Sequence, residues 1–121
     1  MKDKTTLVIG ASLKPGRYSH KAINALRHYG YRVVAIGLRE GFIGDIPVLR
    51  DLPEEVDIDT VTLYIGAARQ LHYYDYLTKL NPRRVIFNPG AENRELEEKL
   101  SEFGVETLEE CTLVMLSSGK Y

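Results

Sequence analysis

The segment TLVIGASLKPGR at residues 6–17 constrains the fold of this chain more than any other segment. An apolar run ends in a glycine, a small residue and a hydroxyl, and apolar residues at helical spacing follow. This order is typical of a β-strand that leads through a tight turn into a helix. The backbone N–H groups of such a turn and the positive end of the helix dipole together form an anion site. The sequence therefore predicts a nucleotide-binding loop near its start.

Apolar runs and helical patterns alternate along the rest of the chain. The runs predict buried strands at residues 5–10, 31–36, 60–65, 84–88 and 105–108. Between them, apolar residues at helical spacing predict helices after residue 17, over 71–80 and over 93–103. This alternation indicates one α/β domain over residues 1–121, doubly wound, with a mostly parallel sheet of about five strands and helices on both faces.

Shorter segments carry weaker signals. Residues 46–49 predict a short strand at the sheet edge, because Pro47 is tolerated in few other strand positions. Residues 37–44 are rich in glycine and predict a connection without regular structure. Residues 52–55 predict a helical turn, and the tail after Glu109 predicts a last helix.

Composition and charge narrow the class of protein. The chain has 121 residues and a net charge of −1, which disfavours a nucleic-acid or anionic-membrane partner. No apolar run approaches the ~20 residues that a membrane helix needs. Residues 1–4 lead straight into a strand, which leaves no room for a signal peptide. With a single cysteine, these features predict a cytoplasmic protein.

A doubly wound sheet binds its ligand beyond the carboxyl ends of its strands. The loops to consider are residues 10–17, 36–41, 64–69 and 88–93. The first loop lacks the G-x-G-x-x-G spacing of dinucleotide-binding proteins, and no acid follows the second strand. It also lacks the spacing of a Walker phosphate loop. The motif alone therefore does not name the nucleotide.

Positive charge gathers near these loops. The cations in or beside them are Lys14, Arg17, Lys21, Arg39 and Arg69. A protein of slightly negative net charge that collects cations at one edge suits a ligand with several phosphates. The alternative, that each is an ordinary solvated side chain, stays open at this point.

Taken in order, these motifs resemble the small CoA-binding domain family, a Rossmann-like module that is similar to the CoA-binding part of the succinyl-CoA synthetase α subunit. The opening motif is Gly10-Ala11-Ser12-x-x-Pro15-x-Arg17-x-Ser19. Further matches spread over nearly the whole chain: Gly30-Tyr31-x-Val33-Val34, Ile43-Gly44, residues 47–49, Leu52-Pro53, Val56-Asp57, residues 88–93 and residues 104–111.

The resemblance implies CoA as the ligand and assigns three groups of residues to it. The first loop would hold the pyrophosphate, the end of the second strand would flank the adenosine, and the loop after the next long strand would line the groove. The implied site residues are Gly10, Ala11, Ser12, Lys14, Pro15, Arg17, Ile36, Gly37, Arg39, Tyr64, Ile65 and Gly66. We expect the backbone N–H groups of residues 11 and 12 and the hydroxyl of Ser12 to contact the pyrophosphate.

The chain departs from the family pattern in two places. Family members often carry Asn-Pro after the second strand, where this chain has Gly37-Leu38-Arg39. They also often carry an aromatic residue followed by Gln, where this chain has Phe87-Asn88. These differences affect the adenosine contacts and the far end of the groove more than the pyrophosphate loop.

No catalytic constellation is evident in the sequence. Cys111 follows two acids that disfavour its thiolate, and a small apolar role is expected. His20 is expected at the surface, and Glu92, Glu95, Glu97 and Glu98 are expected to form a solvated helix face. Tyr74 falls outside the apolar stripe of its helix and is a candidate anchor for a homodimer.

Three functions remain open on these grounds. The first is a CoA or acyl-CoA binding protein that catalyses no reaction. The second is an NADP- or NAD-binding redox protein or sensor, in which Arg39 accepts a 2′-phosphate. The third is an interaction module that kept the fold and lost the ligand.

Overall fold

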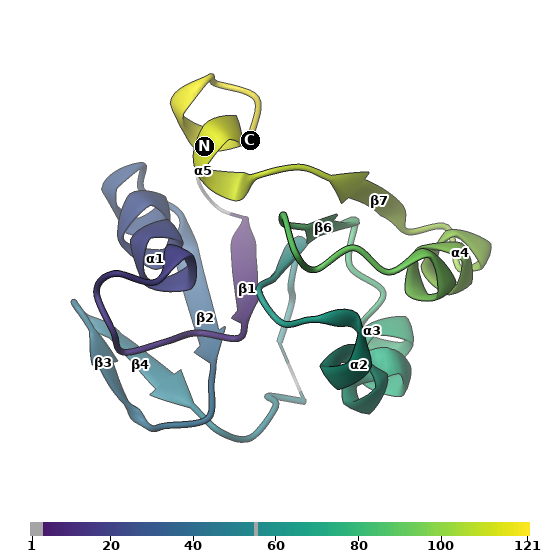
Figure 1. Ribbon diagram of the computed structural model, residues 1–121, viewed down its shortest axis with the longest axis horizontal. Helices are drawn as coiled ribbons and strands as arrows, with labels where there is room; N and C mark the ends of the chain where they lie inside the picture. The colour runs from purple at the N-terminus through teal and green to yellow at the C-terminus, as the bar shows by residue number, and fades with distance from the viewer. Residues whose placement is uncertain (1–3, 55) are drawn as a thin grey trace.

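One sheet of seven strands forms the centre of the computed structural model, which describes residues 4–54 and 56–121 (Figure 1). The strands are β1 (Thr5–Ile9), β2 (Arg32–Ile36), β3 (Gly41–Ile43), β4 (Ile46–Leu49), β5 (Thr60–Leu63), β6 (Arg84–Phe87) and β7 (Glu106–Glu109). Their order is β3-β4-β2-β1-β5-β6-β7, and every neighbouring pair is parallel except β3 and β4. The predicted α/β class with a mostly parallel sheet is confirmed, whereas the expected strand number was too low.

The strand order reverses next to β1. The chain starts in the middle of the sheet, moves outward through β2 to β4, and returns to β5 on the other side of β1. Without the short β3, this is the doubly wound order of dinucleotide-binding folds. The gap between the ends of β1 and β5 is therefore the switch point, where such sheets bind their ligands.

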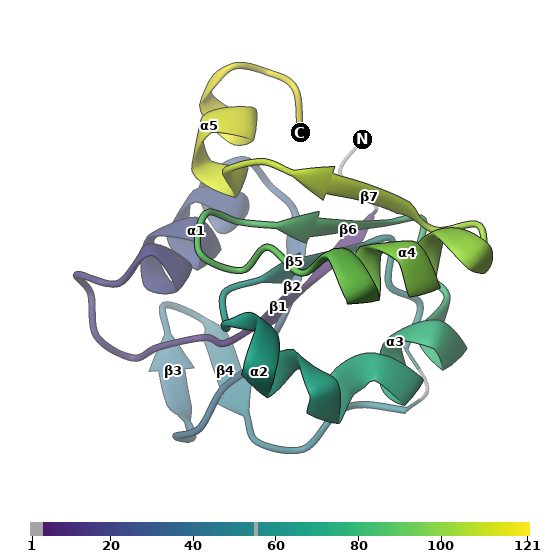
Figure 2. The same cartoon turned by 45° about the vertical axis from the view of Figure 1, so that its right-hand side comes forward.

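Helices cover both faces of the sheet (Figure 2). On one face lie α1 (Tyr18–His28) and α5 (Thr112–Ser117), which contact each other. On the other lie α2 (Ala67–Gln70), the 3₁₀ turn η1 (Leu71–Tyr73), α3 (Tyr74–Leu80) and α4 (Arg94–Glu102). β1 is buried on both sides because Val8 packs with α1 and α5, whereas Leu7 and Ile9 pack with α3 and α4. Burial on both sides explains the continuous apolar run that identified this strand.

The hairpin of β3 and β4 differs from the prediction. Residues 41–43 lie in the segment expected to lack regular structure, yet they form the edge strand β3. β4 is therefore not the edge strand. Pro47 is tolerated there because the register pairs only Val48 and Leu49 of β4 with β2, so the missing N–H of proline costs no bond to β2.

Two predicted helical segments also differ. The helix expected over 71–80 begins earlier, at Ala67, and is divided into α2, η1 and α3. It ends as expected before Pro82, with Asn81 in the left-handed conformation at φ 48°. Residues 52–54 form no helix, and Glu55 lies outside the described residues. A residue that precedes proline is disfavoured in the helical region, which accounts for Leu52.

The acids expected to form a solvated helix face include one exception. Glu97 of α4 has its Oε2 atom buried without a hydrogen-bond partner. Burial, together with the carboxyl group of Glu109 on β7, raises the pKa of Glu97 to about 7. Glu97 and Glu109 thus form an interacting pair of carboxyl groups between α4 and the edge strand β7. This pair could not be predicted from the sequence, because it depends on how β7 packs against α4.

Candidate functional site

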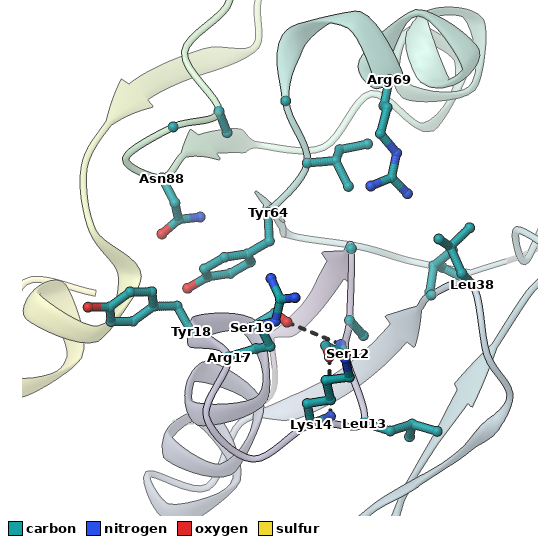
Figure 3. Close-up of a pocket in the computed structure, with 18 of the residues that line it drawn as sticks. Ser12, Leu13, Lys14, Arg17, Tyr18, Ser19, Leu38, Tyr64, Arg69 and Asn88 are labelled. Atoms are coloured by element: carbon teal, nitrogen blue, oxygen red, sulfur yellow. Dashed lines mark hydrogen bonds between the residues drawn. The ribbon is translucent and has the colours of Figure 1, made fainter.

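A cavity of about 760 Å³ opens at the switch point, within the range typical of small-molecule sites (Figure 3). Five chain segments converge on it from the carboxyl ends of the strands. They are the β1–α1 loop with the start of α1, the end of β2, the β5–α2 loop, the β6–α4 loop, and the start of α5. The cavity therefore lies where the topology predicts a ligand.

Glycines let the strand ends approach one another below this cavity. A Cβ atom on Gly37 would lie 2.3 Å from the carbonyl oxygen of Ala11. Gly10 adopts φ +98°, and a Cβ there would lie 2.8 Å from the side chain of Ile65. Both distances are too short for any side chain. The loops after β1, β2 and β5 can meet only because these two positions lack one.

The predicted site residues converge almost completely. Every residue of the predicted set lines the cavity except Pro15, which lies exposed in the turn closed by the Arg17 N–H bond to the Lys14 carbonyl at 3.1 Å. Lining residues absent from the predicted set are Leu13, Tyr18, Ser19, Leu38, Arg69, Tyr73, Asn88, Pro89, Gly90, Ala91, Cys111 and Leu113. Residues 88–91 belong to the 88–93 loop that the sequence placed at the ligand-binding edge of the sheet, although none of them was in the predicted set.

The backbone N–H groups that were expected to contact the pyrophosphate donate to other groups of the protein instead. The N–H groups of Gly10 and Ala11 donate to the carbonyl of Ile36 at 2.9 and 2.8 Å. The N–H of Ser12 donates to Ser19 Oγ at 3.1 Å (Figure 3). The prediction that the N–H groups of residues 11 and 12 point at a ligand is therefore wrong, because these groups fasten the loop to β2 and to α1.

Other donors of the same loop remain available. α1 has no side-chain cap at Arg17, and the first N–H groups of a helix have no intrahelical acceptor. The hydroxyl of Ser12 accepts from the N–H of Lys14 at 3.2 Å, which leaves its own proton free to be donated. The hydroxyl of Ser19 is in the same situation. The groups able to bind an anion thus lie at the start of α1 and at the hydroxyls of Ser12 and Ser19, and not at the N–H groups of the turn.

The charged side chains of the cavity are all cations. Lys14, Arg17, Arg39 and Arg69 line it, are exposed, and have no carboxylate within ion-pair distance among the described residues. Elsewhere, Arg27 pairs with Asp45 at 2.7 Å. Lys21 does not line the cavity. Its ammonium lies 5.4 Å from the ring centre of Tyr18. The cavity thus has positive charge that the protein leaves unpaired.

The opposite wall is built from satisfied polar groups. The Asn88 side chain donates to Thr62 Oγ1 at 2.6 Å and to the Leu63 carbonyl at 2.9 Å, and it accepts from the Thr112 N–H at 2.9 Å. Burial raises the pKa of Tyr64 beside it to about 12, which keeps its phenol neutral. Asn88 and Tyr64 thus offer shape and neutral polarity, and the charge on this side of the cavity comes from Arg69 of α2.

A second polar network holds the loops after β5 and β6 together. The buried Gln70 side chain donates to the carbonyls of Ile65 and Ala91 at 2.8 and 2.7 Å. Its oxygen accepts from Asn93 Nδ2 at 2.9 Å, and Asn93 also caps α4 through the Leu96 N–H. Because each polar group has a partner, this side of the cavity is preformed. Asn93 Nδ2 also donates to the Tyr74 hydroxyl at 3.0 Å, so Tyr74 contributes to this network.

Candidates for catalysis or metal binding are few. His20 does not line the cavity, and its Nδ1 lies 3.3 Å from Asn24 Nδ2. Cys111 lines the cavity as the N-cap residue of α5. The described residues include no group of three or more His, Cys, Asp or Glu side chains able to hold a metal ion. Within the same residues, no helix is long and apolar enough to span a membrane.

Comparison with known proteins agrees with this geometry. Residues 4–117 match the model of the CoA binding domain. The chain belongs to the CoA-binding domain family. No curated protein sequence matches it.

Solved structures resemble the fold along nearly its whole length. The crystal structure of an uncharacterized protein is 44% identical, with a TM-score of 0.94 over 98% of both chains. A Thermus thermophilus protein, cell-free ID.343, is 23% identical with a TM-score of 0.84, over 98% of this chain and 91% of that one. The apo acetyl-coenzyme A synthetase 1 of Candidatus Korarchaeum cryptofilum shares the fold at 15% identity and a TM-score of 0.72, over 87% of this chain and 25% of that one.

Proposed function

We propose that this protein is a stand-alone, single-domain CoA or acyl-CoA binding protein that catalyses no reaction. Family membership and the cationic cavity at the switch point support this proposal. The unpaired cations carry the argument, because a protein of net charge −1 has no structural reason to gather them at one cavity without acids. We further propose a cytoplasmic location.

The diphosphate of CoA binds at the start of α1 in this proposal. Arg17 neutralises it, the hydroxyls of Ser12 and Ser19 donate to it, and the first N–H groups of α1 face it. Lys14 adds a second positive charge at the same end of the cavity. The adenosine lies toward the end of β2, and the pantetheine extends along the neutral wall that contains Tyr64 and Asn88.

The cavity has little means to drive chemistry. Among the described residues, its lining contains neither histidine nor an acid, the side chains that most often act as general acid or base. The polar atoms of the Asn88 side chain form hydrogen bonds within the protein, and the Tyr64 phenol stays neutral at physiological pH. These features favour carrying, sensing or buffering the ligand over transforming it.

Titration calorimetry with CoA, NADP and NAD tests the ligand. We expect CoA to bind and the nicotinamide cofactors to bind at least tenfold more weakly. Arg39 at the end of β2 is the one feature that favours NADP, because an arginine there can accept a 2′-phosphate. Binding of NADP in preference to CoA would reject the proposal.

Two arginine variants test the location. Arg17→Gln should weaken CoA binding about tenfold, as expected for the loss of one charge-assisted hydrogen bond. Arg50→Gln is the matched control, because Arg50 is exposed and does not line the cavity. Equal affinities of the two variants would place the diphosphate elsewhere.

A further inference from the structure

The end of β2 places an arginine at a fixed point of the cavity rim. The N–H of Gly37 donates to the Leu49 carbonyl at 2.9 Å, and the same residue packs against the Ala11 carbonyl. Both contacts fix the backbone two residues before Arg39. Leu38, which lies between Gly37 and Arg39 in the chain, is 71% exposed and lines the rim of the cavity (Figure 3). The chain thus presents an apolar side chain followed by a guanidinium at the place where a doubly wound sheet contacts a ribose.

Arg39 is not used by the protein itself. It is exposed, and no carboxylate lies within ion-pair distance of it among the described residues, although Glu40 is its neighbour in the chain. No described contact gives this guanidinium a structural task.

The number of cations exceeds what a diphosphate needs. A diphosphate diester carries about two negative charges, and a phosphate monoester adds about −1.5 to −2 at neutral pH. The cavity lining holds Lys14, Arg17, Arg39 and Arg69 without an acid. Lys14 and Arg17 belong to the β1–α1 loop, so the charge at the β2 end remains to be matched.

We infer that Arg39 binds a phosphate monoester on the ribose of the ligand and thereby makes the site selective for 3′-phosphorylated CoA over dephospho-CoA. This inference rests on the proposed function, because it assumes that CoA occupies the cavity. Leu38 provides apolar surface for the adenine, and the Arg39 guanidinium donates to the monoester oxygens. The planar guanidinium suits a phosphate better than an ammonium group does. The protein then distinguishes CoA from dephospho-CoA, which keeps the diphosphate and lacks the ribose monoester.

Calorimetry with CoA and with dephospho-CoA on the same variants tests this inference. We expect the unaltered protein to bind CoA about tenfold or more tightly than dephospho-CoA. Arg39→Gln should weaken CoA binding by about that factor and change dephospho-CoA binding less than twofold. Arg39→Lys should keep part of the preference, because it keeps the charge and loses the fork of donors.

Arg17→Gln is the matched comparison, since it should weaken both ligands by the same factor. Equal binding of the two ligands to the unaltered protein would overturn the inference and leave CoA binding intact. A preference that survives Arg39→Gln would overturn it as well. Failure of both ligands to bind would reject the proposed function itself, so the two failures are distinguishable.

Discussion

The two walls of the cavity are built in opposite ways. On the wall formed by the β1–α1 loop and the end of β2, Lys14, Arg17 and Arg39 are exposed, and no carboxylate among the described residues lies within ion-pair distance of them. The remaining cation of the described lining, Arg69, belongs to α2, which follows β5. On the wall formed by the loops after β5 and β6, Gln70, Asn88 and Asn93 use their polar atoms within the protein. The first wall is suited to binding charge, and the second to holding its shape. Stability and affinity should therefore respond to different substitutions.

Asn88→Ala should have the largest effect, and it should act on stability. The substitution removes the side-chain partner of the Leu63 carbonyl and of the Thr112 N–H, and it leaves Thr62 Oγ1 with only its hydrogen bond to Thr112 Oγ1 at 2.8 Å. Unsatisfied buried groups of this kind cost about 3 kcal/mol of unfolding free energy in total. Chemical denaturation measures the loss. Asn24→Ala is the control, because Asn24 is exposed and should change stability by less than about 0.5 kcal/mol.

Similar stabilities of these two variants would mean that the neutral wall is not held by its hydrogen bonds. A large loss with unchanged CoA affinity in the folded fraction would instead sharpen the contrast between the walls. Affinity would then depend on the cationic wall alone.

Added salt should have the next largest effect, and it should act on affinity. Exposed charges are screened by salt, with a Debye length of about 10 Å at 0.1 M. Raising the salt concentration from low to near-molar values should weaken CoA binding about tenfold, equivalent to ~1.4 kcal/mol. Calorimetry at several salt concentrations measures this slope. A binding constant independent of salt would show that the unpaired cations do not contact the ligand.

The smallest effect concerns pH and lies away from both walls. The pKa of Glu97 is raised from 4.5 to about 7 in the folded protein. As pH rises from about 4.5, the unfolded chain loses this proton before the folded protein does, so stability falls until about pH 7 and then levels off. Glu97→Gln should remove this fall, which we expect to be on the order of 1 kcal/mol after solvent screening. Thermal melts from pH 5 to pH 8 measure it.

The Glu97→Gln variant is also a control for CoA affinity, because its substitution lies away from both walls of the cavity. Its CoA affinity should equal that of the unaltered protein at each pH, because the Glu97–Glu109 pair does not line the cavity. Parallel stability curves for the two proteins would contradict the assigned pKa shift.

The topology around the site could be predicted from the sequence more completely than the hydrogen bonds within the site. The continuous apolar runs of β1 and β5 follow from burial on both faces, so these strands and the loops after them could be predicted. β3 could not, because its three residues carry no periodic signal and form only as the partner of β4. Position along a parallel sheet predicted the loops at residues 10–17, 36–41, 64–69 and 88–93, all of which contribute to the cavity lining. The individual site residues came from the family resemblance.

The direction of backbone donors was beyond prediction for a physical reason. The N–H groups of Gly10 and Ala11 turn inward because the Ile36 carbonyl, distant in the chain, offers an acceptor. The buried oxygen of Glu97 depends in the same way on the docking of β7. Contacts between separate chain segments decide both cases, and a single sequence does not report them.

Amide chemical shifts during titration with CoA test the central claim most directly. We predict that the largest shifts fall on residues 18–20 at the start of α1 and on Leu38 and Arg39, with small shifts at Gln70 and Asn93. Large shifts confined to the network of Gln70 and Asn93, with none at the start of α1, would contradict the account.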